Sequence, residues 1–190
     1  MFFLSVVPIG LLVGYLSGGR LSGLGKLPLR WLPLVLGALV IQLLIFPLFS
    51  SDPILPFAGV SLHILSYALL VVWIAANIRI LPMSLLGAGA ICNFVVVTAN
   101  GGFMPASIDA VQSAGLSHLA ERLTTEGVYA NLIRMSSSTR LNFLGDVLYL
   151  PRWIPSSAAF SIGDLLIMLA LVWLIAKGMR VDAKQVSKAA

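Results

Sequence analysis

The sequence Thr98-Ala-Asn-Gly-Gly-Phe-Met-Pro105 opens the one long polar segment of this chain, and Ser161-Ile-Gly-Asp164 closes it. The rest of the sequence is nearly continuous apolar residues. Of the 190 residues, 59% are hydrophobic and 10% are charged, and the mean hydropathy is +1.01. A soluble domain carries roughly 25% charged residues. The composition therefore predicts a polytopic membrane protein, with residues 1–190 forming a single transmembrane domain.

Five apolar runs lie around the polar segment, each close to the ~20 residues that a helix needs to cross a bilayer. We predict an all-α membrane protein with five transmembrane helices, over residues 2–17, 31–49, 57–77, 83–99 and 162–176. The first run is expected to be retained rather than cleaved as a signal peptide, because no basic residue precedes it and no small-x-small site follows it. In that run, Gly10 and Gly14 have the spacing that lets a neighbouring helix approach closely.

The charges between the runs predict the orientation of the chain. With the N-terminus outside, the inner segments carry a net charge of +7 and the outer segments −2, which together give the formal +5 of the whole chain. Every basic residue in a short loop then lies inside, as the positive-inside rule requires. We predict an N-out, C-in topology. Because topology accounts for the excess of basic over acidic residues, no nucleic-acid partner is expected.

This topology places residues 100–161 on the outer side. Ser107, Ile108, Val111, Leu116, Leu119 and Leu123 form a loose helical stripe. Gly115 is expected to separate two short helices there. Apolar residues over 128–135 predict another short helix, and residues 141–153 are too apolar for a free loop. We expect short amphipathic helices on the membrane surface and a re-entrant segment that dips back toward the bundle.

Four short blocks carry a resemblance to a known family. They are Gly18-Gly-Arg-Leu21, Asn100-Gly-Gly-Phe-Met-Pro105, Thr139-Arg-Leu-x-x-Leu-Gly-Asp146 and Phe160-Ser-Ile-Gly-Asp164. In this order they resemble the signature blocks of an uncharacterised bacterial integral membrane protein family, domain of unknown function family 5317. The resemblance implies bacterial origin and a multi-pass fold, and no particular activity. We expect the protein to lie in the bacterial cytoplasmic (inner) membrane.

Two acidic residues are candidate site residues. Asp164 follows Ser161 by three residues at the start of the last run, which is the spacing of a helix capping box, so a structural role is favoured over ligand binding. Asp146 lies in a largely apolar stretch, and Arg140 is close enough in sequence to pair with it. Such a semi-buried ion pair is equally consistent with a structural clamp and with a binding site.

Asn100, Gly101 and Gly102 end the fourth run. Asn and Gly readily adopt the left-handed conformation that terminates helices, so a helix C-cap is the favoured interpretation. Two consecutive glycines exceed what a cap requires. The alternative is that their backbone N–H groups face a ligand.

Polar side chains inside three of the runs share a similar depth. Counted from the outer ends, Gln42, His63 and Asn93 lie about 10 Å below the outer surface, at 1.5 Å per residue. Tyr67 lies one turn below His63 on the same face. Interhelical hydrogen bonds that fix packing are the favoured interpretation. The functional alternative is an outward-facing polar pocket roofed by residues 100–161.

Common enzyme signatures are missing, and with His63 and His118 as the only histidines we expect no metal and no cofactor. Three functions remain open. The favoured one is a non-enzymatic protein that binds or moves a hydrophobic or lipid-like small molecule, such as a membrane lipid, at the outward-facing pocket. The second is an accessory subunit that packs against other membrane subunits of a larger complex. The third is a membrane-embedded enzyme that uses Asp146, Asp164 and His63.

Overall fold

The computed structural model describes residues 5–45, 59–154 and 156–181. Three of its helices are long and apolar enough to cross a membrane: α3 (Gly59–Ala76), α4 (Pro82–Ala99) and α7 (Ile162–Met179). Two further apolar helices are shorter within the described residues: α1 (Val6–Leu16) and α2 (Leu32–Ile45). The first three predicted spans also include residues 2–4, 46–49 and 57–58, which lie outside the described residues.

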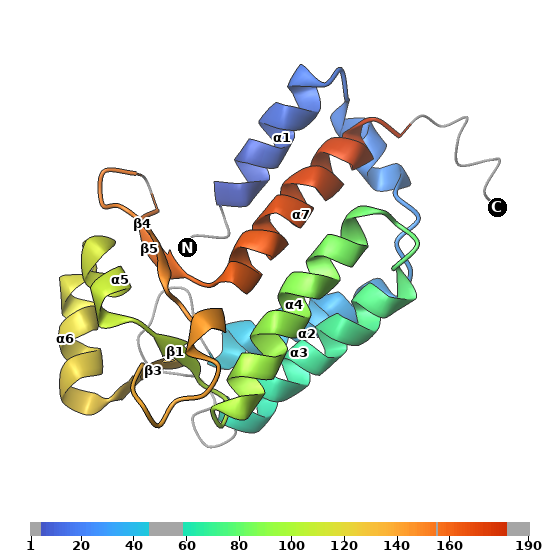
Figure 1. The fold of residues 1–190 in the computed structure, drawn as a ribbon. Helices are drawn as coiled ribbons and strands as arrows, with labels where there is room; N and C mark the ends of the chain where they lie inside the picture. Colours follow the sequence, from blue (N-terminus) through green and yellow to red (C-terminus); the bar gives the residue numbers. More distant parts are fainter. Residues whose placement is uncertain (1–4, 46–58, 155, 182–190) are drawn as a thin grey trace.

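The five apolar helices pack side by side. We call this set of helices the row, and by the ends of the row we mean the two ends of the helices along their axes. In Figure 1, α1 and α4 flank α7, α3 lies next to α4, and α2 packs on α3. Large apolar side chains on all five helices remain exposed, including Leu16 at 80% and Leu12 at 59%. Exposed apolar surface of this extent suits contact with lipid rather than with water. The apolar helices therefore have the surface expected of a membrane protein.

Glycines set the spacing of the row at both faces of α7. A Cβ on Gly89 of α4 would lie 2.5 Å from the carbonyl oxygen of Gly163, so the backbones of α4 and α7 are nearly in contact there. On the other face, Gly10 and Gly14 of α1 lie against Ile175 and Met179 of α7. The close approach predicted from the Gly10 and Gly14 spacing is therefore present, with α7 as the neighbour.

Residues 100–161 form a compact connecting segment that joins the end of α4 to the start of α7 at one end of the row (Figure 1). It contains two α-helices and two small sheets. Its elements are β1 (Met104–Ala106), α5 (Ile108–Ser113), α6 (Ser117–Glu126), β2 (Val128–Tyr129), β3 (Leu132–Arg134), the 3-10 helix η4 (Asn142–Leu144), β4 (Leu148–Leu150) and β5 (Ala158–Phe160). The protein is thus mostly helical, but the prediction of an all-α fold missed the strands.

The prediction of a short helix over residues 128–135 is wrong. Strand β3 lies between β1, to which it is parallel, and β2, to which it is antiparallel. Ala130 has a φ of +53° and turns the chain between β2 and β3. Val128 and Ile133 are β-branched and suit strands, and pairing with the distant β1 decides the outcome in favour of a sheet.

The two predicted helices on either side of Gly115 are present as α5 and α6, and Gly115 has the expected positive φ of +78°. Their apolar stripe, however, points into the connecting segment itself. Val111 and Leu123 are fully buried against the strands and Ala120. The expectation that this stripe lies on the membrane surface is therefore wrong, because the sheet covers it.

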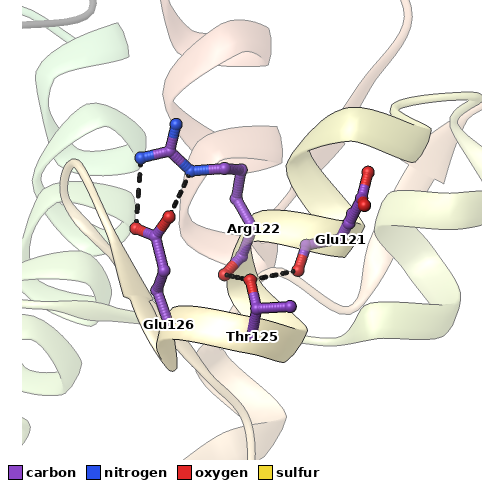
Figure 2. A network of polar contacts seen from close by, with 4 residues as sticks. All are labelled: Glu121, Arg122, Thr125 and Glu126. Carbon is purple, nitrogen blue, oxygen red and sulfur yellow. Dashed lines mark hydrogen bonds and ion pairs between the residues drawn. The ribbon is translucent and has the colours of Figure 1, made fainter.

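The opposite face of α6 is polar and exposed. Figure 2 shows Arg122 and Glu126 facing each other one helical turn apart, with the Arg122 Nε 2.6 Å from a Glu126 carboxylate oxygen. The Thr125 hydroxyl donates to the backbone carbonyls of Glu121 and Arg122. An ion pair this exposed contributes at most about 1 kcal/mol. It marks the solvent-facing side of the connecting segment.

Residues 141–153 contact the end of α4 and then enter a two-stranded sheet. Leu141 and Leu144, at η4, pack against Val96 and Val97 near the end of α4. The chain then continues into β4, which pairs antiparallel with β5. The re-entrant segment predicted from the apolarity of this stretch is instead a buried contact plus a hairpin.

The far end of the row, opposite the connecting segment, is held by a different set of contacts. The 3-10 helix η2 (Leu21–Lys26) packs on the last turn of α7. Asn77, just after α3, is buried, and its side-chain amide accepts from the Arg30 backbone N–H at 2.8 Å and donates to the Arg30 carbonyl at 3.0 Å. This amide ties the chain that precedes α2 to the end of α3.

The contact at Gly89 makes a prediction about stability. Gly89→Ala places a methyl group against the Gly163 backbone, which should lower the free energy of unfolding by about 1–3 kcal/mol. Gly37→Ala in α2 is the matched control, because a Cβ there meets nothing within 4 Å. It should be neutral or slightly stabilising. Thermal unfolding in detergent, followed by tryptophan fluorescence, measures both. Equal midpoints for the two variants would contradict the close approach of α4 and α7.

Candidate functional site

Asn93 is the centre of a polar cluster where α4, α7 and the connecting segment meet. Its Nδ2 donates to the Asp164 carboxylate at 2.6 Å, and its Oδ1 accepts from the Ser161 hydroxyl at 2.9 Å. Asn93 and Ser161 are almost completely buried. A hydrogen bond to a carboxylate in such a setting is stronger than one between neutral groups. Asn93 therefore links the middle of α4 to the first turn of α7.

The start of α7 is the predicted capping box. The Asp164 backbone N–H donates to the Ser161 hydroxyl at 2.9 Å, and the Ser161 backbone N–H donates to the Asp164 carboxylate at 3.1 Å. Gly163 lies between them, and a Cβ there would overlap the Asn93 Oδ1. The predicted capping box is confirmed. Both of its carboxylate oxygens are used by the bonds that Asn93 and Ser161 donate.

Asp146 enters the same region from the connecting segment. Its backbone is fixed on β1: its N–H donates to the Pro105 carbonyl at 2.8 Å, and its carbonyl accepts from the Ser107 N–H at 3.0 Å. Its side chain is only 7% exposed, and the Oδ1 atom has no hydrogen-bond partner among the described residues. A buried acceptor without a donor costs about 1–3 kcal/mol. Such an atom calls for a proton, a water molecule or a ligand.

The environment of Asp146 favours its neutral form. Burial, and to a lesser extent the nearby Asp164 carboxylate, raises the pKa of the Asp146 carboxyl well above its ordinary value. Among the described residues no cation pairs with Asp146, since the only ion pair there is the one between Arg122 and Glu126.

The predicted ion pair between Arg140 and Asp146 is therefore wrong. The Arg140 side chain is exposed, and only its backbone is engaged: its N–H donates to the Asn100 Oδ1 at 2.8 Å, and its carbonyl accepts from the Asn100 Nδ2 at 2.8 Å. The turn at Leu141, with a φ of +55°, follows directly. Arg140 thus helps to attach the connecting segment to α4 through its backbone, not its charge.

Asn100, Gly101 and Gly102 end α4 as the cap interpretation predicts. Gly101 and Gly102 have φ values of +66° and +96°, and their N–H groups donate to the carbonyls of Thr98 and Val97. These N–H groups are used by the helix end, which disfavours the alternative in which they face a ligand. A Cβ on Gly102 would lie 2.5 Å from a methyl of Val60, so the turn also packs closely on α3.

The predicted polar layer is present but divides into two parts. Gln42 of α2 donates to the Ser66 hydroxyl at 3.3 Å, and that hydroxyl donates to the His63 carbonyl at 2.7 Å. The His63 Nδ1 lies 2.9 Å from the Gly102 carbonyl oxygen. Both contacts join helices or secure the turn after α4. This part of the layer therefore has the packing role that the sequence favoured.

Tyr67 joins this part to the polar cluster around Asn93. Its ring centroid lies 5.2 Å from that of His63, and its hydroxyl is hydrogen-bonded to the Asn93 side chain, with the carboxyl groups of Asp164 and Asp146 nearby. We call Tyr67, Asn93, Asp146 and Asp164 the junction site. It brings side chains from α3, α4, α7 and the connecting segment together.

Ser66 and Asn77 were missed by the sequence analysis. Both are buried and both bridge segments that are distant in sequence. Ser66 follows His63 by three residues, which places it on the same helical face and could have identified it. Asn77 lies at the end of a predicted span, where an amide has no distinctive signal.

The fold and the junction site define a mostly helical protein with apolar helices of membrane-spanning length and a buried polar cluster at one end. Residues 26–176 match the family of unknown function DUF5317. Because the match covers most of the chain, this protein belongs to that family. No curated protein and no solved structure matches the chain.

Asp146 makes a prediction about pH dependence. Its raised pKa in the folded state means that the unfolded chain loses this proton at a lower pH than the folded protein. The stability contributed by the neutral carboxyl is therefore fully present below about pH 4 and is lost as the pH rises through the folded-state pKa. Asp146→Asn should remove this pH-dependent loss of stability, because an amide does not titrate. Its unfolding midpoint should fall less than that of the wild type between pH 4 and pH 8.

Asp109→Asn is the matched control, because Asp109 is an exposed carboxylate in the same connecting segment. It should keep the wild-type dependence of the unfolding midpoint on pH. If the unfolding midpoints of Asp146→Asn and of the wild type changed with pH in parallel between pH 4 and pH 8, Asp146 would be ionised in the folded protein across this pH range.

Proposed function

We propose that this protein is a multi-pass protein of the bacterial cytoplasmic membrane that binds a lipid-like small molecule at the junction site. The single observation that carries the proposal is the buried Asp146 carboxyl, whose Oδ1 has no partner among the described residues. It lies where the apolar row meets the polar connecting segment. A molecule with an apolar body and a polar head suits such a boundary.

The chemistry of the junction site indicates the kind of head group. The site contains two carboxyl groups and no basic side chain paired with either of them among the described residues. A hydroxyl or amino head group would donate to Asp146 and satisfy the buried acceptor. Tyr67 lies beside it and supplies an aromatic surface and a hydroxyl. We therefore assign the ligand to lipid-like molecules whose head donates a hydrogen bond.

The membrane arrangement is part of the proposal. We place α1 and α2 as spans alongside α3, α4 and α7, with the N-terminus outside and the connecting segment on the outer side. The charges support this topology, since the helix ends remote from the connecting segment have basic residues in or next to their last turns: Arg20, Lys26, Arg79, Lys177 and Arg180. The junction site then lies on the side of the outer leaflet.

A second role is favoured by a different observation. The row leaves α2 with α3 as its main helical neighbour, and α2 exposes Leu36, Leu39, Val40 and Leu43. An accessory subunit that packs α2 against another membrane protein would cover this face. The enzymatic alternative has less support, because the Asp164 carboxylate is already bonded to Asn93 and Ser161.

The topology is tested by cysteine labelling in intact cells. In a Cys92→Ser background, Ser137→Cys places a thiol in the connecting segment, and Ser22→Cys places one in η2. Both serines are exposed. A membrane-impermeant maleimide should label Ser137→Cys in intact cells and Ser22→Cys only after lysis. The reverse pattern would contradict the N-out, C-in orientation.

Ligand binding is tested by native mass spectrometry of the gently solubilised protein, with identification of the retained lipid. The wild type should retain one class of lipid-like molecule with a hydroxyl or amino head. Asp146→Ala, which removes the acceptor, should reduce its occupancy by roughly tenfold, the scale of one lost hydrogen bond to a strongly polar group. Asp109→Ala is the control that removes the same functional group outside the junction site.

Equal occupancy in the wild type and Asp146→Ala would contradict the proposed site. Copurification of other membrane proteins at a fixed stoichiometry, with no retained lipid, would support the accessory-subunit role instead.

A further inference from the structure

A basic cavity lies at the far end of the row, where η2 meets the end of α7. Its volume is about 400 Å³. Arg20, Lys26 and Arg180 line it together with the hydroxyls of Ser17 and Ser22. None of the three basic side chains forms an ion pair with any residue of the described ranges. The cavity therefore gathers positive charge without a counter-charge from this part of the chain.

The backbone brings these cations together from two segments that are far apart in sequence. The Arg20 N–H donates to the Met179 carbonyl at 2.7 Å, and a Cβ on Gly23 would lie 2.5 Å from the Gly178 carbonyl oxygen. The negative C-terminal end of a helix dipole attracts basic residues, which accounts for Arg180 as the C-cap of α7. The dipole does not require that Arg20 and Lys26 line the same cavity as Arg180.

An apolar groove continues from the basic cavity along the row. Its volume is about 590 Å³, and it shares Ser17, Arg180 and Val181 with the cavity. It runs between α1 and α7, with Lys177 at its basic end. Its apolar lining consists of Val13, Leu169, Val172, Trp173 and Ala176. The two cavities are thus adjacent, and together they provide a site with a cationic end and an apolar arm.

We propose that this site binds one anionic phospholipid, with its phosphate in the basic cavity and an acyl chain in the apolar groove. Basic pockets at the ends of transmembrane helices bind anionic head groups, and Arg and Lys donate charge-assisted hydrogen bonds to phosphate oxygens. The charge of the cavity selects an anionic head, and the groove selects a molecule with a hydrocarbon chain. This inference does not rest on the junction site, which lies at the opposite end of the row.

The test titrates the full-length protein in detergent with phosphatidylglycerol and, separately, with phosphatidylcholine of the same acyl chains, read by native mass spectrometry. The wild type should bind phosphatidylglycerol more tightly. The double variant Arg20→Gln/Arg180→Gln should weaken phosphatidylglycerol binding by roughly fivefold for each charge removed, and leave phosphatidylcholine binding unchanged. Both side chains are exposed, so the fold should tolerate their replacement.

Arg79→Gln is the matched control, since it removes one positive charge near the same end of the row from a residue outside the cavity and the groove. It should bind phosphatidylglycerol as the wild type does. Equal affinity of the wild type for the two lipids, or an equal loss in Arg79→Gln and the double variant, would overturn the site. Displacement of the lipid by glycerol 3-phosphate at the same concentration would assign the cavity to a soluble anion and would overturn a role for the groove.

Discussion

The hydrogen bond between Asn93 and Asp164 is the interaction on which the rest of this structure depends. The connecting segment leaves the row at the end of α4 and returns at the start of α7, so its two ends must be held together. Asn93 does this by bonding both Asp164 and Ser161, the two members of the α7 capping box. The bond requires Gly163 beside it, because any Cβ there would occupy the position of the amide oxygen.

The two ends of the row differ in charge, because different segments pack on them. At the junction site, carboxyl groups are buried under the connecting segment, and one carboxyl oxygen of Asp146 has no partner among the described residues. At the far end, Arg20 and Arg180 are gathered around a cavity by backbone contacts between η2 and α7. Buried acidic groups thus lie at one end of the helices, and a cluster of basic groups lies at the other.

The candidate site was predictable where its chemistry is local. The capping box of Asp164 follows from a three-residue spacing, and the turn at Gly101 and Gly102 follows from the conformational freedom of glycine. The shared depth of Gln42, His63 and Asn93 was also readable from helix geometry. Their hydrogen-bond partners could not be predicted from the sequence. Gln42 donates to Ser66 of α3, whereas Asn93 donates to Asp164 of α7. Arg140 seemed a partner for Asp146 by proximity in sequence, yet the backbone turns its side chain to the surface.

By itself, the sequence determined the apolar helices, the polar connecting segment, the helix pair broken at Gly115 and the membership of the family, because each depends on composition or on short-range spacing. Only the tertiary structure decided the order of the helices in the row, the strands over residues 128–134 and the burial of Asp146. A β-strand such as β3 exists because β1 lies beside it, and no local pattern specifies a partner that is distant in the chain. Long-range packing supplied that information.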